Sequence, residues 1–149
     1  MYSINQIEEL ATKFREAIVK AKSAGEFDDV VFKNFPSGCC GDTSDLLARY
    51  LLNNGIKTKY ASGAYHNISH AWLITNNGII VDITGDQFHD ELEFMNYSHC
   101  VYVGILDKFH NLFINDDDYA EKEPADFEKP REYYEGRLLK LYYQICKYV

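Results

Sequence analysis

Apolar positions recur at helical spacing in three stretches of the chain. The first spans residues 3–22, with Ser3 as its N-cap and lysines near its end. The second spans about residues 40–54 and starts at or just after Cys40, behind a turn that contains proline and glycine. The third spans residues 130–149, with a proline at its start. The pattern therefore predicts three helices, each with one apolar face.

Between the second and third helices the pattern changes to alternation with a period of two. Such alternation predicts half-buried strands, and the turn residues between them predict hairpins. No βαβ repeat occurs, so we expect an α+β domain with helices around an antiparallel sheet. The expected strands cover residues 56–65, 69–74, 79–84 and 99–106, with a turn or short helix over 85–93 and irregular connections over 26–39 and 107–129.

The hairpin after the second strand fixes which side chains share a face. A three-residue loop, residues 76–78, with its glycine in the left-handed conformation, pairs Trp72 with Asp82. Because side chains alternate along a strand, His70 and Asp82 then lie on one face as diagonal neighbours. A slip of one residue would separate them, so the register is itself a prediction.

Composition and charge exclude several classes of protein. A chain of 149 residues with 46% hydrophobic and 15% aromatic content predicts one globular domain, residues 1–149. The net charge of −8 argues against nucleic acid or an anionic membrane as partner, because both are bound through clustered Lys and Arg. The N-terminus lacks the pattern of a signal peptide, and no apolar run is long enough for a membrane helix. We therefore expect a cytoplasmic protein whose four cysteines stay reduced.

Three residues carry candidate chemistry: Cys40, His70 and Asp82. A cysteine at the first turn of a helix faces unpaired N–H groups and the positive end of the helix dipole, which favour a thiolate. A cysteine nucleophile also needs a base, and histidine needs a carboxylate to fix its tautomer. The three residues predict a Cys-His-Asp triad, with Gly41 leaving room for substrate near the backbone N–H groups.

The same residues carry a resemblance to a known family. The segments GCCGDTSDLLARYLLNNGIKTKYASGAY, SHAWLI and IIVDIT resemble the transglutaminase-like superfamily, which shares the papain-like cysteine-protease architecture. In that superfamily a cysteine opens a helix that ends at a Gly-Ile pair, matched here by Cys40 and Gly55-Ile56. The resemblance covers residues 35–88 and implies a small, single-domain member of the bacterial type. It implies that Cys40, His70 and Asp82 act as nucleophile, base and orienting acid, on a helix packed against an antiparallel sheet.

Further residues near these motifs are candidates for an oxyanion donor or for lining the cleft. Asn34 stands six residues before Cys40, where the papain-like fold often keeps an oxyanion donor, although a turn explains an asparagine equally well. Asp86 and Gln87 follow the last strand of the hairpin, and they either line the cleft or end the strand. The full set is Asn34, Cys39, Gly41, Trp72, Asp86 and Gln87.

A zinc site is the competing chemical interpretation. It would use Cys39, Cys40, His66 and His70, but adjacent cysteines are poor chelators compared with Cys-x-x-Cys spacing. His66 also rivals His70 as the base, yet it stands at an expected turn. The acidic run at 116–118 lacks the glycine and glutamate of a calcium loop. We therefore expect neither a metal nor a cofactor.

The sequence thus favours a cysteine-dependent hydrolase or acyltransferase that acts on an amide bond through a thioester. The resemblance leaves open a peptidase, a glutamine deamidase or a transglutaminase-like enzyme, with a protein or peptide as substrate. The alternative is a catalytically inactive transglutaminase-like module that keeps the fold and binds a partner.

Overall fold

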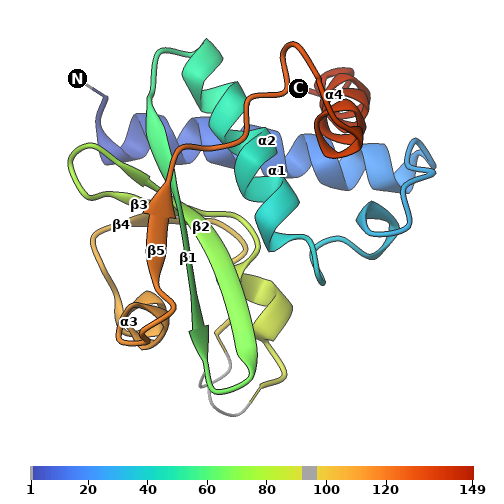
Figure 1. Ribbon diagram of the computed structural model, residues 1–149. Helices are drawn as coiled ribbons and strands as arrows, with labels where there is room; N and C mark the ends of the chain where they lie inside the picture. The colour runs from blue at the N-terminus through green and yellow to red at the C-terminus, as the bar shows by residue number, and fades with distance from the viewer. Residues whose placement is uncertain (1, 92–96) are drawn as a thin grey trace.

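The computed structural model describes residues 2–91 and 97–149, and its fold is α+β (Figure 1). In these residues, five strands form one antiparallel sheet in the order β4-β3-β2-β1-β5. In chain order the elements are α1 (Ile4–Ser23), a 3₁₀ helix (Phe32–Asn34), α2 (Cys40–Asn53), β1 (Thr58–Tyr65), β2 (Ile68–Thr75), β3 (Ile80–Asp82), a 3₁₀ helix (Gly85–Phe88), β4 (Tyr102–Gly104), α3 (Lys108–Ile114), β5 (Ala120–Lys122) and α4 (Tyr133–Cys146).

The three predicted helices are confirmed, with one changed start. Ser3 caps α1 in a capping box with Gln6, and α2 begins at Cys40. The last helix begins at Tyr133 and not at the predicted Pro130, because Glu132 occupies the N-cap and exchanges hydrogen bonds with the third residue of the helix.

The predicted hairpin register is confirmed. Leu73 pairs with Val81, so the β2–β3 ladder has the alignment that places Trp72 opposite Asp82. Gly78 has a φ of 79°, the left-handed conformation that the three-residue loop requires. His70 and Asp82 consequently share one face of the sheet.

The prediction of an irregular connection over 107–129 is wrong, because this segment contains α3 and β5. The side chain of Asp107 caps α3 by accepting from the backbone N–H of His110. A helix of 7 residues is too short to show helical periodicity clearly, and the three exposed residues of β5 show no alternation. Both elements form because they can pack against the existing sheet, which single-sequence patterns do not reveal.

The other predicted boundaries differ less from the observed ones. The predicted strand 99–106 is reduced to Tyr102–Gly104, and the first predicted strand begins at Thr58. The 3₁₀ helix Gly85–Phe88 lies within the segment predicted as a turn or short helix, of which residues 92 and 93 lie outside the described residues.

Helices cover both faces of the sheet. The larger core joins α1, α2 and α4 to the face that carries Leu73, Val81 and Ile83. The smaller core is aromatic and places α3 against the opposite face, which carries Trp72 and Ile80. In Figure 1, α3 correspondingly lies apart from the other three helices. Among the described residues, no helix combines the length and apolar character needed to cross a membrane.

Candidate active site

Asp82, the last residue of β3, is a buried carboxylate shared by two histidines. Its Oδ2 atom accepts hydrogen bonds from Nε2 of His70 and Nε2 of His110, each at 2.7 Å. Its Oδ1 atom accepts from the backbone N–H of Thr84 at 2.9 Å. His70 is 1%, Asp82 2% and His110 0% exposed. Burial alone would raise the pKa of Asp82, but His70 and His110 outweigh burial and hold this pKa well below its usual range.

The bond to Asp82 sets the tautomer of His70. An ionised carboxylate can only accept, so Nε2 of His70 carries the hydrogen and Nδ1 is left with a lone pair when the ring is neutral. Within the described part of the chain, this buried Nδ1 makes no hydrogen bond. A buried ring nitrogen without a partner is costly, so its environment needs an explanation.

Cys40 supplies that explanation. It is the first residue of α2, which lies against β1 and β2, and its side chain is half-buried. Cys40 is among the groups that raise the pKa of His70, so its sulfur lies near the His70 ring. Nε2 of that ring is already bound to Asp82, which leaves Nδ1 as the nitrogen available to the thiol. Burial lowers the pKa of His70, but Asp82 and then Cys40 favour the charged ring and raise this pKa to about 9. The arrangement suits transfer of a proton between sulfur and Nδ1.

Cys39 is placed differently from its neighbour. Its side chain is 0% exposed and donates to the carbonyl oxygens of Val31 and Ser37. Burial raises the pKa of the Cys39 thiol to about 12, which keeps it protonated. Cys39 therefore belongs to the core and does not line a cleft, contrary to its place among the candidates.

Trp72 is too deeply buried to line a cleft, and Asp86, left open between lining the cleft and ending the strand, forms an ion pair. Trp72 is wholly buried and packs against the rings of His70 and His110, at centroid distances of 5.6 and 4.9 Å. Both carboxylate oxygens of Asp86 bind Arg15 of α1 at 2.8 Å, which anchors the end of the hairpin to that helix.

The remaining candidates lie near turns or the start of α2. The Oε1 atom of Gln87 accepts from the N–H of Gly38 at 3.3 Å, so Gln87 joins the hairpin to the loop before Cys40. A Cβ atom on Gly41 would stand 3.0 Å from the Tyr60 hydroxyl, which explains the small residue. Asn34 is exposed at the end of a 3₁₀ helix, and its carbonyl accepts from the N–H of Ser37, in keeping with the turn interpretation.

Sequence reasoning missed His110. This residue lies on α3, the helix that was not predicted, and its Nδ1 is 2.6 Å from Oδ1 of Asp107. The available signal was Asp107 as an N-cap before Phe109 and Phe113, which are four residues apart. Gly63 makes this packing possible, because a Cβ atom there would stand 2.3 Å from the carbonyl oxygen of Phe113.

His70, Asp82 and His110 are also the residues that could gather around a metal ion, since their ligand atoms lie within 4.8 Å of one another. Ligand atoms about 2.1 Å from a tetrahedral zinc ion stand roughly 3.4 Å apart. The two N–O separations of 2.7 Å are shorter and match hydrogen bonds. The zinc quartet considered above is not assembled, because Cys39 lies in the core and His66 is exposed at the β1–β2 turn.

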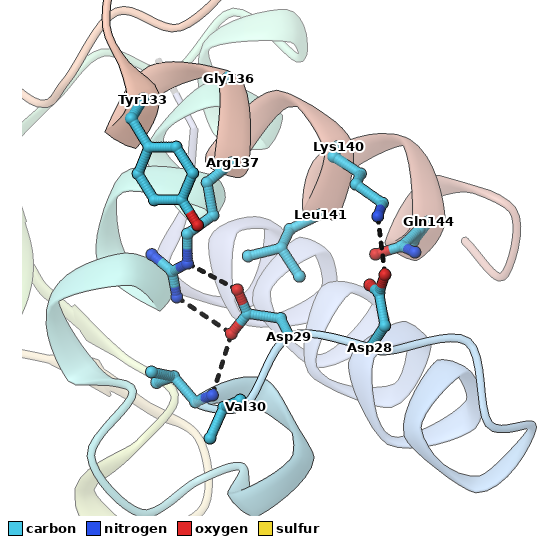
Figure 2. A pocket seen from close by; sticks show the side chains of 10 residues that line it. Asp28, Asp29, Val30, Tyr133, Gly136, Arg137, Lys140, Leu141 and Gln144 are labelled. Atoms are coloured by element: carbon cyan, nitrogen blue, oxygen red, sulfur yellow. Dashed lines mark hydrogen bonds and ion pairs between the residues drawn. The ribbon is translucent and has the colours of Figure 1, made fainter.

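A cavity of about 650 Å³ lies between α4 and the segment 28–31 (Figure 2). Arg137 at its wall binds Asp29 at 2.6 Å and Asp42 at 2.6 Å, and Lys140 binds Asp28 at 2.9 Å. The triad side chains are not among its lining residues.

Hydrogen bonds thus join His70, Asp82, His110 and Asp107, and Cys40 lies near enough to raise the pKa of His70. Compared with known protein families, with curated proteins and with solved structures, the chain has no significant match.

Proposed function

We propose that the protein is a cysteine-dependent hydrolase or acyltransferase that acts on an amide bond of a protein or peptide. The observation that carries the proposal is the buried His70 ring, whose Nε2 is bound to Asp82 while Nδ1 has Cys40 as its neighbour. This order of groups is the one that a thiol nucleophile, a base and an orienting carboxylate require.

The reaction begins from a Cys40 thiolate beside a protonated His70, the pair formed when the thiol proton resides on Nδ1 of His70. The sulfur then adds to the amide carbonyl carbon, and a tetrahedral oxyanion forms. Collapse of this intermediate breaks the C–N bond, and His70 returns the proton to the departing amine, which leaves a thioester on Cys40. Water or an amine attacks the thioester with His70 as base, the C–S bond breaks, and the thiol is restored.

The start of α2 supplies groups for the oxyanion. Backbone N–H groups in the first turn of a helix lack intrahelical acceptors, and they carry partial positive charge. Those of Cys40 and Gly41 stand next to the nucleophile in the chain. Such donors are worth most where water is excluded.

The papain-like architecture is part of the same proposal. A helix that begins with the cysteine lies against an antiparallel sheet that carries the histidine and the carboxylate, as the transglutaminase-like resemblance implies. The four cysteines are free thiols, which suits a reducing compartment such as the cytoplasm.

Alkylation by iodoacetamide tests the proposal, with mass spectrometry used to locate the modified cysteine. At neutral pH we expect Cys40 to be alkylated at least about tenfold faster than the exposed Cys100, because a nearby imidazolium stabilises the thiolate. His70→Gln should lower the Cys40 rate to that of Cys100, while Cys100→Ala should leave the Cys40 rate unchanged. Equal rates at Cys40 and Cys100 in the wild type would contradict the proposal and favour the inactive binding module.

Acyl transfer is tested with p-nitrophenyl acetate. The wild type should release nitrophenol and carry an acetyl group on Cys40 in the intact mass spectrum. Cys40→Ala, with Cys39 kept, should do neither. Acetylation of another residue at the wild-type rate would show that Cys40 is not the nucleophile.

A further inference from the structure

His110 is held between two carboxylates. Its Nε2 is 2.7 Å from Oδ2 of Asp82, and its Nδ1 is 2.6 Å from Oδ1 of Asp107. Ionised carboxylates only accept hydrogen bonds, so each ring nitrogen must carry a hydrogen for both bonds to form. The ring satisfying both contacts is the charged imidazolium.

The electrostatic surroundings of His110 support that charge. Asp107 caps its own helix, Asp82 faces it from β3, and His70 lies beyond Asp82 on β2, with a ring-centroid separation of 6.1 Å from His110. Tyr102 on β4 stacks on the ring at 5.4 Å, and Tyr97 meets it edge-on at 6.2 Å. Both tyrosines have a pKa raised by burial and stay neutral near pH 7.

Burial on its own lowers the pKa of His110. The hydrogen bonds and charges of Asp107 and Asp82 outweigh burial, so the pKa lies above its usual value. The ring is 0% exposed, and water does not screen these interactions. Asp107 is itself partly exposed, and its pKa stays below the usual range through its bonds to His110.

We propose, building on the function proposed above, that His110 is a positioning residue for the Cys40–His70 pair. As a cation clamped by Asp107, it holds the Asp82 carboxylate through Oδ2, the same oxygen that binds His70. It also offsets part of the negative charge that His70 experiences. The site is then a chain of five groups, Cys40, His70, Asp82, His110 and Asp107, in place of a triad.

The charge of His110 has a definite effect on the pH profile of the site. A nearby cation lowers the pKa of every neighbouring group. Removing the charge of His110 should therefore raise those pKa values. His110→Gln keeps an N–H donor for Asp82 but removes the charge. The expected shift is on the order of one pH unit, for charges about 6 Å apart in a partly polar interior.

The experiment measures the iodoacetamide labelling rate of Cys40 in the full-length protein from about pH 5 to pH 10, with peptide mapping to separate Cys40 from the other cysteines. His110→Gln is compared with the wild type and with His89→Gln, which removes a ring beside Asp90 on the surface. The pH of half-maximal labelling should rise in His110→Gln and stay unchanged in His89→Gln. A uniform decrease in rate with an unchanged midpoint would mean that His110 is only structural, and would overturn the positioning role.

Nitrogen-15 NMR of the histidine rings gives a second measurement that needs no reactivity and works even if His110→Gln does not fold. In the wild type, His110 should keep hydrogens on both ring nitrogens through the pH range in which exposed histidines titrate. In Asp107→Asn it should lose one of them at lower pH than in the wild type, because one acceptor has lost its charge. A wild-type His110 with one hydrogen at pH 6 would overturn the proposal.

The two proposals fail differently. If wild-type Cys40 labels no faster than Cys100, the proposed function falls and the positioning role falls with it. If wild-type Cys40 labels fast but His110→Gln has an unchanged midpoint, only the positioning role falls.

Discussion

Two ionic clusters flank α2, and they differ in what they leave unpaired. In the Asp82 cluster, made of His70, Asp82, His110 and Asp107, the first three side chains are 0–1% exposed and that of Asp107 is 23% exposed. Among the described residues, Nδ1 of His70 makes no hydrogen bond. The Arg137 cluster, made of Asp29, Asp42 and Arg137, is half-buried, with side chains 14–16% exposed. Its guanidinium is bound by both carboxylates, as Figure 2 shows for Asp29.

The difference separates a network that stabilises from a network suited to chemistry. Arg137 ties α4 to the segment before α2 and to the first turn of α2, and each of its charges has a partner. In the Asp82 cluster, charge is buried where water cannot help and one buried ring nitrogen is left without a hydrogen bond, which costs stability and is hard to explain by packing alone.

The largest effect is expected for Asp82→Asn. The asparagine preserves the shape but leaves the buried His70 without a carboxylate partner and His110 with Asp107 alone, which should lower the free energy of unfolding at pH 7 by about 3–5 kcal/mol. Urea denaturation measures this loss, and Asp42→Asn, in the more exposed cluster, should cost less than Asp82→Asn. A loss below about 1 kcal/mol for Asp82→Asn would contradict the role assigned to the buried charge.

The second prediction concerns the pH dependence of stability. Because Asp82 and Cys40 raise the pKa of His70 to about 9 from its usual 6.5, against the effect of burial, the folded state binds a proton that the unfolded chain releases. This stability is fully present below about pH 6.5 and is lost as pH rises through about 9, by about 1.4 kcal/mol per pKa unit. His110 contributes in the same direction.

The matching measurement is the free energy of unfolding between about pH 6 and pH 7.5, a window about one unit below the ordinary pKa of cysteine. The wild type should lose stability across this window, and His70→Gln should lose less. The Arg137 cluster should not contribute, because the pKa of Asp29 is lowered and that of Arg137 is raised, away from the window. Equal slopes in the two proteins would contradict a charged His70.

The sequence predicted the parts of the site that depend on local rules. The start of α2 at Cys40 follows from a turn before an amphipathic run, and the pairing of His70 with Asp82 follows from the length of the loop that ends at Gly78. The start of α2 and the register of the β2–β3 hairpin each depend on a segment of about 20 residues or fewer.

The parts that sequence reasoning missed depend on tertiary packing. His110 reaches Asp82 across 28 positions of sequence, from a seven-residue helix that is stabilised by packing of Phe109 and Phe113 on Trp72 and its neighbours. Likewise, Cys39 and Cys40 are adjacent in sequence, and only the structure shows that one side chain lies in the core. Asp86 could not be assigned either, since its partner Arg15 lies 71 positions away.

A moderate effect is expected for Arg137→Met. The methionine keeps apolar volume but leaves Asp29 and Asp42 without their cation, which should lower the free energy of unfolding by about 1.5–3 kcal/mol. The labelling rate of Cys40 should change less than about threefold, because Arg137 has no bond to the Asp82 cluster. A loss of labelling as large as in His70→Gln would mean that the two clusters are coupled through the first turn of α2.

The smallest effects are expected for two glycine substitutions, one beside α3 and one beside Arg137. Gly63→Ala places a Cβ atom 2.3 Å from the carbonyl oxygen of Phe113, so α3 must move away from β1, and the expected cost is about 1–3 kcal/mol. Gly136→Ala, on α4 beside Arg137, meets nothing within 4 Å and should stabilise the protein by about 0.5–1 kcal/mol through helix propensity. Thermal denaturation gives both signs, and Gly63→Ala should also slow Cys40 labelling, because α3 carries His110. If Gly63→Ala were neutral in both measurements, close packing of α3 on the sheet would not be needed to hold His110 against Asp82.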